Sequence, residues 1–337
     1  MGDRMRLLPF GELLARIFEE YRTQGSIFGL AESTWYRKPD DRSVRIMGEH
    51  CETALGPAAG PHTQLAQNIA SSYLTGSRFI ELKTVQILDA LELDKPCIDA
   101  ADEGYNTEWS TELALEEAWR EYARGWVLLH LLEELFDLRG SEHPRSFLFN
   151  MSVGYDLAGI QREPMQRYIA RMRDSSQEPE FAGWVEAVRT TVPRMLEGTG
   201  LEHKVEAVSR LEVNPRICRS VTLSTMHGCP PDEIEAICNH LLHDWSLDTY
   251  VKLNPTLIGY ESVSDILTRL GYGYVKLDRS GFEHDLNYDE ALSILGRLRQ
   301  SAREDFRRFG VKLTNTLPSV NTLGRLPGEE YFLSGRA

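Results

Sequence analysis

The sequence has few cysteines, and their arrangement excludes several kinds of site. Its five cysteines among 337 residues are scattered and include no Cys-x-x-Cys pair. A disulfide framework, a structural zinc and a bound iron–sulfur cluster are therefore unsupported in this chain. Scattered free cysteines in an odd number are typical of a reducing compartment, so we expect a cytoplasmic protein.

The sequence also lacks a long apolar run, a net positive charge and a nucleotide-binding glycine motif. The most apolar run, 126–136, is too short to span a bilayer and contains His130 and two glutamates. The net charge of −14 argues against binding to nucleic acid or to an anionic membrane surface. Neither GxGxxG nor GxxxxGK[ST] occurs, so no dinucleotide-binding or P-loop domain is expected. The first 21 residues resemble an amphipathic helix rather than a secretory signal.

What the sequence does contain is an alternation of short apolar runs with longer helical patterns. This alternation is typical of an α/β protein with a parallel sheet. Six core strands are expected, near Thr53–Gly56, 78–83, 147–151, 220–224, 250–254 and 311–315. A closed barrel of the TIM type needs eight strands. The sequence therefore predicts an incomplete (β/α)8 barrel in which strands seven and eight are missing.

The expected helices suggest how the chain is divided. They fall near 1–21, 63–74, 110–138, 231–243, 262–270 and 288–308, with a further helical stretch at about 157–210. We expect residues 1–45 to form a helical extension and residues 46–337 to form the incomplete barrel. The stretch at about 157–210 is expected to be a helical insertion in that barrel.

Small, basic or amide residues follow the expected strands, at the barrel end where chemistry occurs. Ala58, Ala59 and Gly60 have no bulky side chain, so a ring system could lie against their backbone and accept its hydrogen bonds. A tight strand-to-helix turn explains them equally well. Lys83 and Lys252 end two apolar strands, where burial is costly without an anion. A single strand-end lysine usually extends to solvent, but two at one barrel end favour an anionic ligand.

Cys229 and the nearby histidines allow both chemical and structural interpretations. Cys229 precedes a helix that begins at Pro231, and the positive end of a helix lowers the pKa of a thiol. Nucleophilic or general-base chemistry with His227 is one hypothesis, and an inert buried cysteine is the other. His240 and His243 are spaced for a metal, but no third ligand is placed. We interpret them as ordinary helix residues and expect no metal site.

The ordered strand ends resemble those of the FMN barrels of the dihydroorotate and dihydropyrimidine dehydrogenases. The segments GPAAGPHTQLAQNI, FIELKTVQILD, NTEWSTE, STMHGCPPDEIEAI and VKLNPTL are similar to the N-terminal domain of the family named as selenate reductase subunits. Members are large predicted iron–sulfur flavoproteins, in which a module for FAD, NAD(P)H and 4Fe-4S clusters follows the barrel. The resemblance implies an oxidoreductase that passes electrons between that module, as partner or further chain, and an unknown planar substrate.

The resemblance also implies which residues contact FMN. They are Ala58, Ala59, Gly60, Lys83, Thr84, Asn150, Lys252, Asn315 and Thr316. Asn150 is also the counterpart of the asparagines that hold a planar substrate in the related families, and Asn106 is a weaker counterpart. In this arrangement Lys252 stabilises the reduced flavin.

The sequence departs from the dehydrogenase pattern in the region that moves a proton. The related barrels place an acid/base Cys or Ser in an Asn-x-Ser-Cys-Pro-like motif, where this sequence has Thr225, and Thr222 replaces the usual Asn. Cys229 lies four residues later and could substitute if its loop folds back. The glycine-rich turns that bind the FMN phosphate after strands seven and eight are expected to be missing. The alternative hypothesis is therefore a catalytically silent barrel that serves as a scaffold or interaction subunit.

Overall fold

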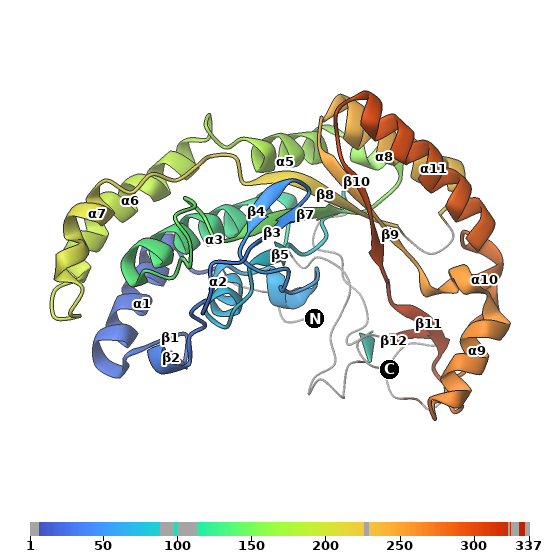
Figure 1. Ribbon diagram of the computed structural model, residues 1–337, viewed down its shortest axis with the longest axis horizontal. Coiled ribbons are helices and arrows are strands. Elements are labelled where there is room, and N and C mark those ends of the chain that lie inside the picture. Colours follow the sequence, from blue (N-terminus) through green and yellow to red (C-terminus); the bar gives the residue numbers. More distant parts are fainter. Residues whose placement is uncertain are drawn as a thin grey trace.

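The core of the molecule is a curved, parallel sheet with the order β10-β9-β8-β7-β5 (Figure 1). The computed structural model describes residues 7–87, 113–225, 229–322 and 324, and the backbone of 98–99 and 330–333. The sheet consists of β5 (Phe79–Glu81), β7 (Leu148–Val153), β8 (Cys218–Ser224), β9 (Asp248–Leu253) and β10 (Phe309–Leu313). All neighbouring pairs are parallel. The described residues thus form a half-barrel of five strands.

Alternation along the strands gives the sheet one apolar and one polar face. On β7, the ring of Phe149 packs edge-on against Trp126, with 5.1 Å between ring centroids. The next residue, Asn150, bonds instead to Thr222 on β8. Successive side chains of a strand point to opposite faces, so the apolar face meets the helices and the polar face lines the inside of the half-barrel.

Helices cover the convex, apolar face of this sheet. Figure 1 shows α5, α8 and α11 along its outer side. The longer helices of the main core are α1 (Phe10–Gln24), α2 (Ala66–Leu74), α3 (Leu115–Phe136), α5 (Glu163–Arg173), α6 (Pro179–Met195), α8 (Pro231–Asn239) and α11 (Tyr288–Glu304). The two largest fully buried side chains, Trp119 and Trp126, both come from α3. Burial of such aromatic rings makes α3 a central support of the main core.

Between β7 and β8 the chain forms α4 (Leu157–Ile160), α5, α6 and α7 (Val205–Ser209). This stretch coincides with the helical segment expected at about 157–210. Two statements about the division of the chain remain predictions. One is that this stretch is an insertion in the barrel, and the other is that residues 1–45 form an extension before it.

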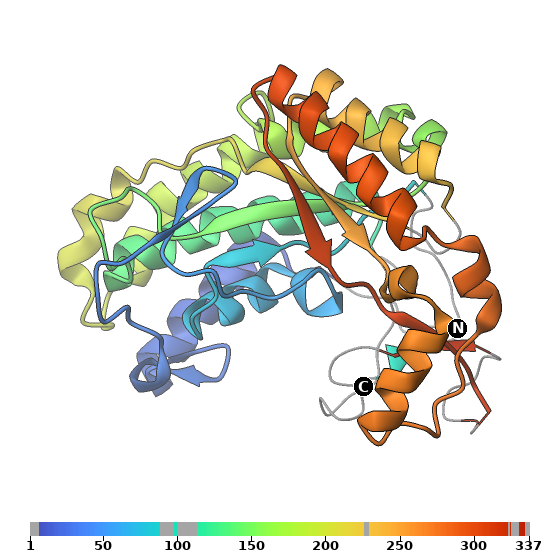
Figure 2. The same cartoon turned by 45° about the vertical axis from the view of Figure 1, so that its right-hand side comes forward.

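A second, smaller core lies beside the carboxyl ends of β9 and β10 (Figure 2). The turn Pro255–Ile258 leads into it, and it is built from α9 (Tyr260–Arg269), α10 (Arg279–His284), β11 (Leu317–Val320) and the connecting residues 270–278. Strand β11 pairs with β12 (Glu330–Leu333), which pairs in turn with β6 (Ile98–Asp99). The buried members of this core are Val263, Leu267, Val275, Leu277 and Leu317.

The prediction of a first strand at Thr53–Gly56 is wrong. The preceding residues form an antiparallel hairpin of β3 (Val44–Ile46) and β4 (Glu49–Cys51). Residues 55–57 then run beside β5 irregularly, and the Leu55 carbonyl accepts from the backbone N–H groups of both Arg78 and Phe79. Proline at position 57 has no N–H to donate to a ladder. A Cβ on Gly56 would lie 1.5 Å from the Phe79 carbonyl oxygen, so this close approach requires glycine.

The other expected core strands and most helices are present, with ends shifted by a few residues. The remaining short elements are β1 (Ser26–Ile27), β2 (Leu30–Ala31), the 3-10 turns Glu32–Thr34, Pro61–Thr63 and Glu202–Lys204, and a π turn at His240–Asp244. In the part of the chain that the structure describes, no helix has the length and apolar character needed to cross a membrane.

Candidate functional site

The inside of the half-barrel is lined by polar side chains that bond to one another between strands. Asn150 on β7 donates from Nδ2 to Thr222 Oγ1 at 2.7 Å and accepts at Oδ1 from Ser220 Oγ at 2.7 Å. Beside them, the hydroxyl groups of Thr84 and Ser152 share a hydrogen bond of 2.8 Å. Asn150 is buried, so these bonds compensate the loss of its hydration. The network fixes β7 against β8.

Lys252 lies in a cluster of two ammonium groups and one carboxylate. In the parallel ladder Lys252 on β9 is the direct partner of Lys312 on β10. Lys312 forms an ion pair with Glu81 of β5, at the other edge of the sheet. Burial lowers the pKa of Lys252 to about 8, the neighbouring Lys312 lowers it as well, and Glu81 opposes them. The cluster therefore holds more positive than negative charge in a half-buried position.

Glu81 stays ionised inside the half-barrel because several groups stabilise its charge. The side chain is almost fully buried, and burial alone would raise its pKa. The Lys312 ammonium, the Ala59 N–H and the Thr222 hydroxyl outweigh burial, so the pKa of Glu81 lies below its usual value.

The first loop, 58–60, is exposed only at its first residue, and its donors are partly used. Ala58 is exposed, Ala59 is half-buried and Gly60 is buried. Ala59 N donates to Glu81 Oε2 at 2.9 Å, and Gly60 N donates to Thr63 Oγ1 at 3.2 Å. A planar ligand could lie against this loop, but those two N–H groups already have acceptors.

Lys83 lies near the first loop. Its side chain is buried, and its backbone carbonyl accepts a hydrogen bond of 2.9 Å from the hydroxyl of Tyr122 on α3. Burial lowers the pKa of the His62 imidazole, a hydrogen bond with Ala58 opposes this, and the charge of Lys83 lowers it further. His62 therefore lies close to both Lys83 and the loop, and sequence reasoning did not select it.

Asn315, after β10, ties together the ends of three neighbouring strands. Its Nδ2 donates to the Thr225 carbonyl at 3.2 Å and to Asn254 Oδ1 at 3.0 Å. Its Oδ1 accepts from Thr316 N at 2.9 Å. The Thr225 hydroxyl donates to the Lys252 carbonyl at 2.6 Å. The expected residues Thr225, Lys252, Asn315 and Thr316 thus belong to one bonded group.

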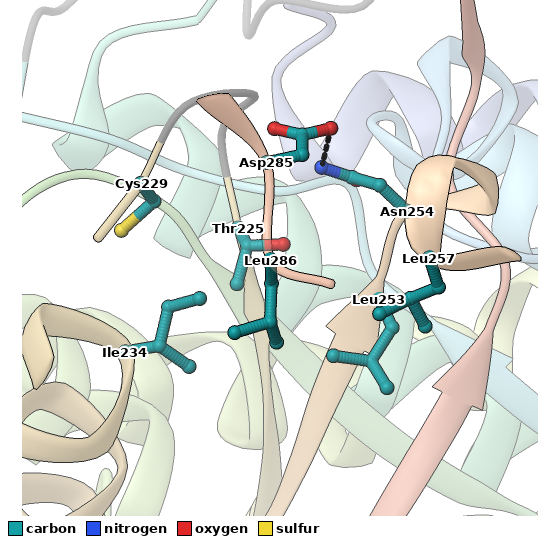
Figure 3. Close-up of a pocket in the computed structure, with 8 residues that line it drawn as sticks. All are labelled: Thr225, Cys229, Ile234, Leu253, Asn254, Leu257, Asp285 and Leu286. Carbon is teal, nitrogen blue, oxygen red and sulfur yellow. Dashed lines mark hydrogen bonds between the residues drawn. The ribbon is translucent and has the colours of Figure 1, made fainter. Parts of the chain in front are cut away.

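A small pocket opens beside this group, and both residues expected to move a proton face it (Figure 3). Its lining residues are Thr225, Cys229, Ile234, Leu253, Asn254, Leu257, Asp285 and Leu286. Asp285 Oδ2 accepts from Asn254 Nδ2 at 3.1 Å and from Thr256 Oγ1 at 2.7 Å. The pocket therefore has an acidic, hydrogen-bonded side, and the charge of Asp285 acts on the thiol of Cys229.

The thiol of Cys229 has the opposite electrostatic character to the one expected from its position before a helix. Burial raises its pKa to about 11, and the carboxylates of Glu233, Asp232 and Asp285 raise it as well. Burial, supported by these carboxylates, therefore keeps the thiol neutral at pH 7. His227 and Asn106 lie outside the described residues.

His240 and His243 behave as ordinary helix-end residues. His240 Nδ1 lies 2.5 Å from Asp244 Oδ2, and His243 Nε2 lies 2.7 Å from Ser301 Oγ. Among the described residues, no group of three or more His, Cys, Asp or Glu side chains could hold a metal ion.

Sequence reasoning missed three charged residues of the site, Glu81, Lys312 and Asp285. The alternation in 79–83 and 309–313 could have indicated the first two, because it places a charged side chain inside an otherwise apolar strand. Asp285 gave no such signal, because it follows a short helix of the second core.

Comparison with known proteins agrees with this architecture. A family model described as the N-terminal TIM-barrel domain of oxidoreductase YgfK matches residues 28–337. "Putative oxidoreductase YgfK" from Escherichia coli K12 and from strain O157:H7 are each 54% identical over 345 residues. These matches cover 100% of this chain and 33% of each relative, so the chain spans about a third of their length.

A solved structure with partial similarity is DHODH from Eimeria tenella in complex with ferulenol. It is 14% identical, with 89% of this chain and 79% of that chain covered and a TM-score of 0.41. A likeness at this level carries no argument about function.

Proposed function

Because this chain belongs to the family of the N-terminal TIM-barrel domain of oxidoreductase YgfK, we propose that it is the FMN-binding barrel of a larger iron–sulfur flavoprotein. The partner in this proposal is an electron-transfer module carrying FAD, 4Fe-4S clusters and a site for NAD(P)H. That module lies on another part of the longer protein or on a separate subunit. The substrate is a small planar molecule bound beside the flavin.

The observation that supports this proposal is the excess positive charge inside the half-barrel. Lys252 and Lys312 share one carboxylate, Glu81, and burial together with Lys312 lowers the pKa of Lys252 to about 8. An anionic group against Lys252 would compensate the charge that burial disfavours. The polar strand ends, and a first loop without bulky side chains, fit a flat ring with polar edges. The residues present therefore fit FMN.

Each candidate site residue has a defined part in this proposal. FMN would supply the transfer of hydride or electrons. Ala58 and Ala59 provide a surface without bulky side chains, and Lys252 stabilises negative charge. The other residues proposed to surround the flavin are Gly60, Lys83, Thr84, Asn150, Asn315 and Thr316.

Thr225 and Cys229 are the candidates for moving a proton. The neutral thiol of Cys229 can donate a proton at pH 7 but is a poor acceptor, given its raised pKa. The hydroxyl hydrogen of Thr225 is already donated to the Lys252 carbonyl. Both observations favour the role of proton donor for Cys229.

The same two observations favour a second candidate function, a catalytically silent scaffold. Neither residue is an efficient general base as placed, and such a barrel would support the electron-transfer module without reacting. The two functions differ in whether flavin binds.

Titration of the purified chain with FMN and with riboflavin tests the proposal. The proposed contacts are to the ring, which both ligands share. We therefore expect similar dissociation constants for the two ligands, measured by flavin fluorescence. Lys252→Met should weaken binding by about tenfold or more, equivalent to about 1.4 kcal/mol. Lys276→Met is the control, because Lys276 is exposed beside the second core. A folded chain that binds neither ligand would favour the scaffold.

A further inference from the structure

One carboxylate oxygen joins the two edges of the sheet and the first loop. Glu81 Oε2 accepts from Ala59 N at 2.9 Å and is also the partner of Lys312 Nζ. Glu81 belongs to β5 and Lys312 to β10, which are the outermost strands of the five. The strong curvature of the sheet brings these strands within ion-pair distance across its polar face.

The ladder registers place this bridge next to Lys252. Lys252 and Lys312 are direct partners on β9 and β10, so their side chains leave the sheet side by side on one face. Glu81 is the direct partner of Asn150 on β7, whose amide is bonded to Thr222 and Ser220. The carboxylate is therefore held on one side by the network and faces the two lysines on the other.

We propose that Glu81 is a positioning residue of this site, which holds the first loop through Ala59 and the ammonium of Lys312 and thereby sets the charge of Lys252. Only the assignment of Lys252 to the flavin rests on the proposed function. The bridge itself is a property of the chain without ligand. A carboxylate that is almost fully buried and bonded to a backbone N–H and an ammonium is far more restricted than a surface acid.

The groups that face Lys252 are few in the described part of the chain. Lys312 from β10 disfavours its charge and Glu81 from β5 favours it. Its register partner on β8 is Ser224, which does not titrate in this range. Loss of Glu81 charge and loss of Lys312 charge should therefore change the protonation of Lys252 in opposite directions.

The pH dependence of Lys252 acylation in the flavin-free chain tests this proposal. An amine-reactive anhydride is applied between pH 6 and 11, and mass spectrometry follows the labelled peptide. Glu81→Gln keeps an acceptor for Ala59 N but removes the charge, so the midpoint of Lys252 should fall and labelling at pH 7 should rise severalfold. Lys312→Met removes a repulsive charge and releases Glu81, so the midpoint should rise and labelling should slow.

Glu133→Gln is the matched control, because Glu133 is a buried carboxylate on α3 that bonds to Ser146 and Tyr73 instead. It should leave the Lys252 midpoint unchanged. Unchanged midpoints in both test variants, or shifts of the same sign, would overturn the proposal. If Glu81→Gln does not fold, Lys312→Met remains as the test, and a Lys252 midpoint that is unchanged or lowered in this variant would overturn the proposal. Failure to bind FMN would contradict the proposed function and leave this result intact.

Discussion

At the scale of single residues, the candidate site shows how neighbours override a local rule. Cys229 stands directly before a helix, where a thiol usually becomes more acidic. Burial and four nearby carboxylates raise its pKa to about 11 instead. Lys252 shows the same principle with the opposite charge, since burial and Lys312 lower its pKa. The chemistry of each group is decided by what surrounds it in space.

The raised pKa of Cys229 predicts slow alkylation near neutral pH. At pH 8 only about one thiol in a thousand would be ionised, and the rate should increase about tenfold per pH unit up to about pH 11. Iodoacetamide labelling followed by mass spectrometry of the Cys229 peptide measures this profile. Asp232→Asn should shift the profile toward lower pH, because one of the carboxylates is removed. Rapid labelling that is already constant below pH 8 would contradict the prediction.

At the scale of elements, the outer helices stabilise the sheet through a narrow apolar face. Helix α11 buries Ala291, Ile294, Leu298 and Ala302, which recur at helical spacing. Its start is fixed by Asn287, whose side chain accepts from Glu290 N at 3.0 Å. The opposite face is in solvent, where Leu292 is 53% exposed.

Two leucines of α11 should therefore respond very differently to truncation. Leu298→Ala should lower the free energy of unfolding by about 2–5 kcal/mol, because the side chain is fully buried and its loss leaves a cavity. Leu292→Ala on the same helix should change it by about 0.5 kcal/mol or less. Urea denaturation of both variants measures the difference. Equal effects would mean that α11 is not packed on the sheet through this face.

The elements were more predictable from the sequence than the contacts between them. Runs such as 220–224 predict strands because β-branched and apolar residues favour an extended backbone. The segment 53–56 was wrongly predicted to be a strand, because its continuation through Gly56 and Pro57 cannot make a regular ladder. The bond between Glu81 and Lys312 joins residues 231 positions apart, so only the curvature of the sheet reveals it. The position of Asp285 depends on the second core and was equally inaccessible.

At the scale of the whole molecule, two separate apolar cores divide the described structure. The main core runs from α1 through the sheet to α11, and the smaller core contains Val263, Leu267, Val275, Leu277 and Leu317. A small core buries less apolar surface and is expected to open at lower free energy than a large one. The candidate pocket includes Asp285 and Leu286, which connect the small core to α11.

Destabilising the small core should therefore have a local effect. Leu267→Ala should accelerate hydrogen exchange in residues 260–286 by at least about tenfold, because its side chain is buried in that core. Exchange in α3 should remain unchanged. The control is Leu270→Ala, since Leu270 is 66% exposed at the end of the same helix. Faster exchange in α3 as well would show that the two cores open together.

The ion pair between Glu81 and Lys312 also has a consequence for the order of folding. It closes a chain segment of 231 residues, and the entropy lost on closing a loop grows with its length. The ladders between β7, β8, β9 and β10 must curve the sheet before the two side chains can meet. We therefore expect the pair to form late in folding, so that its stabilisation acts mainly by slowing unfolding.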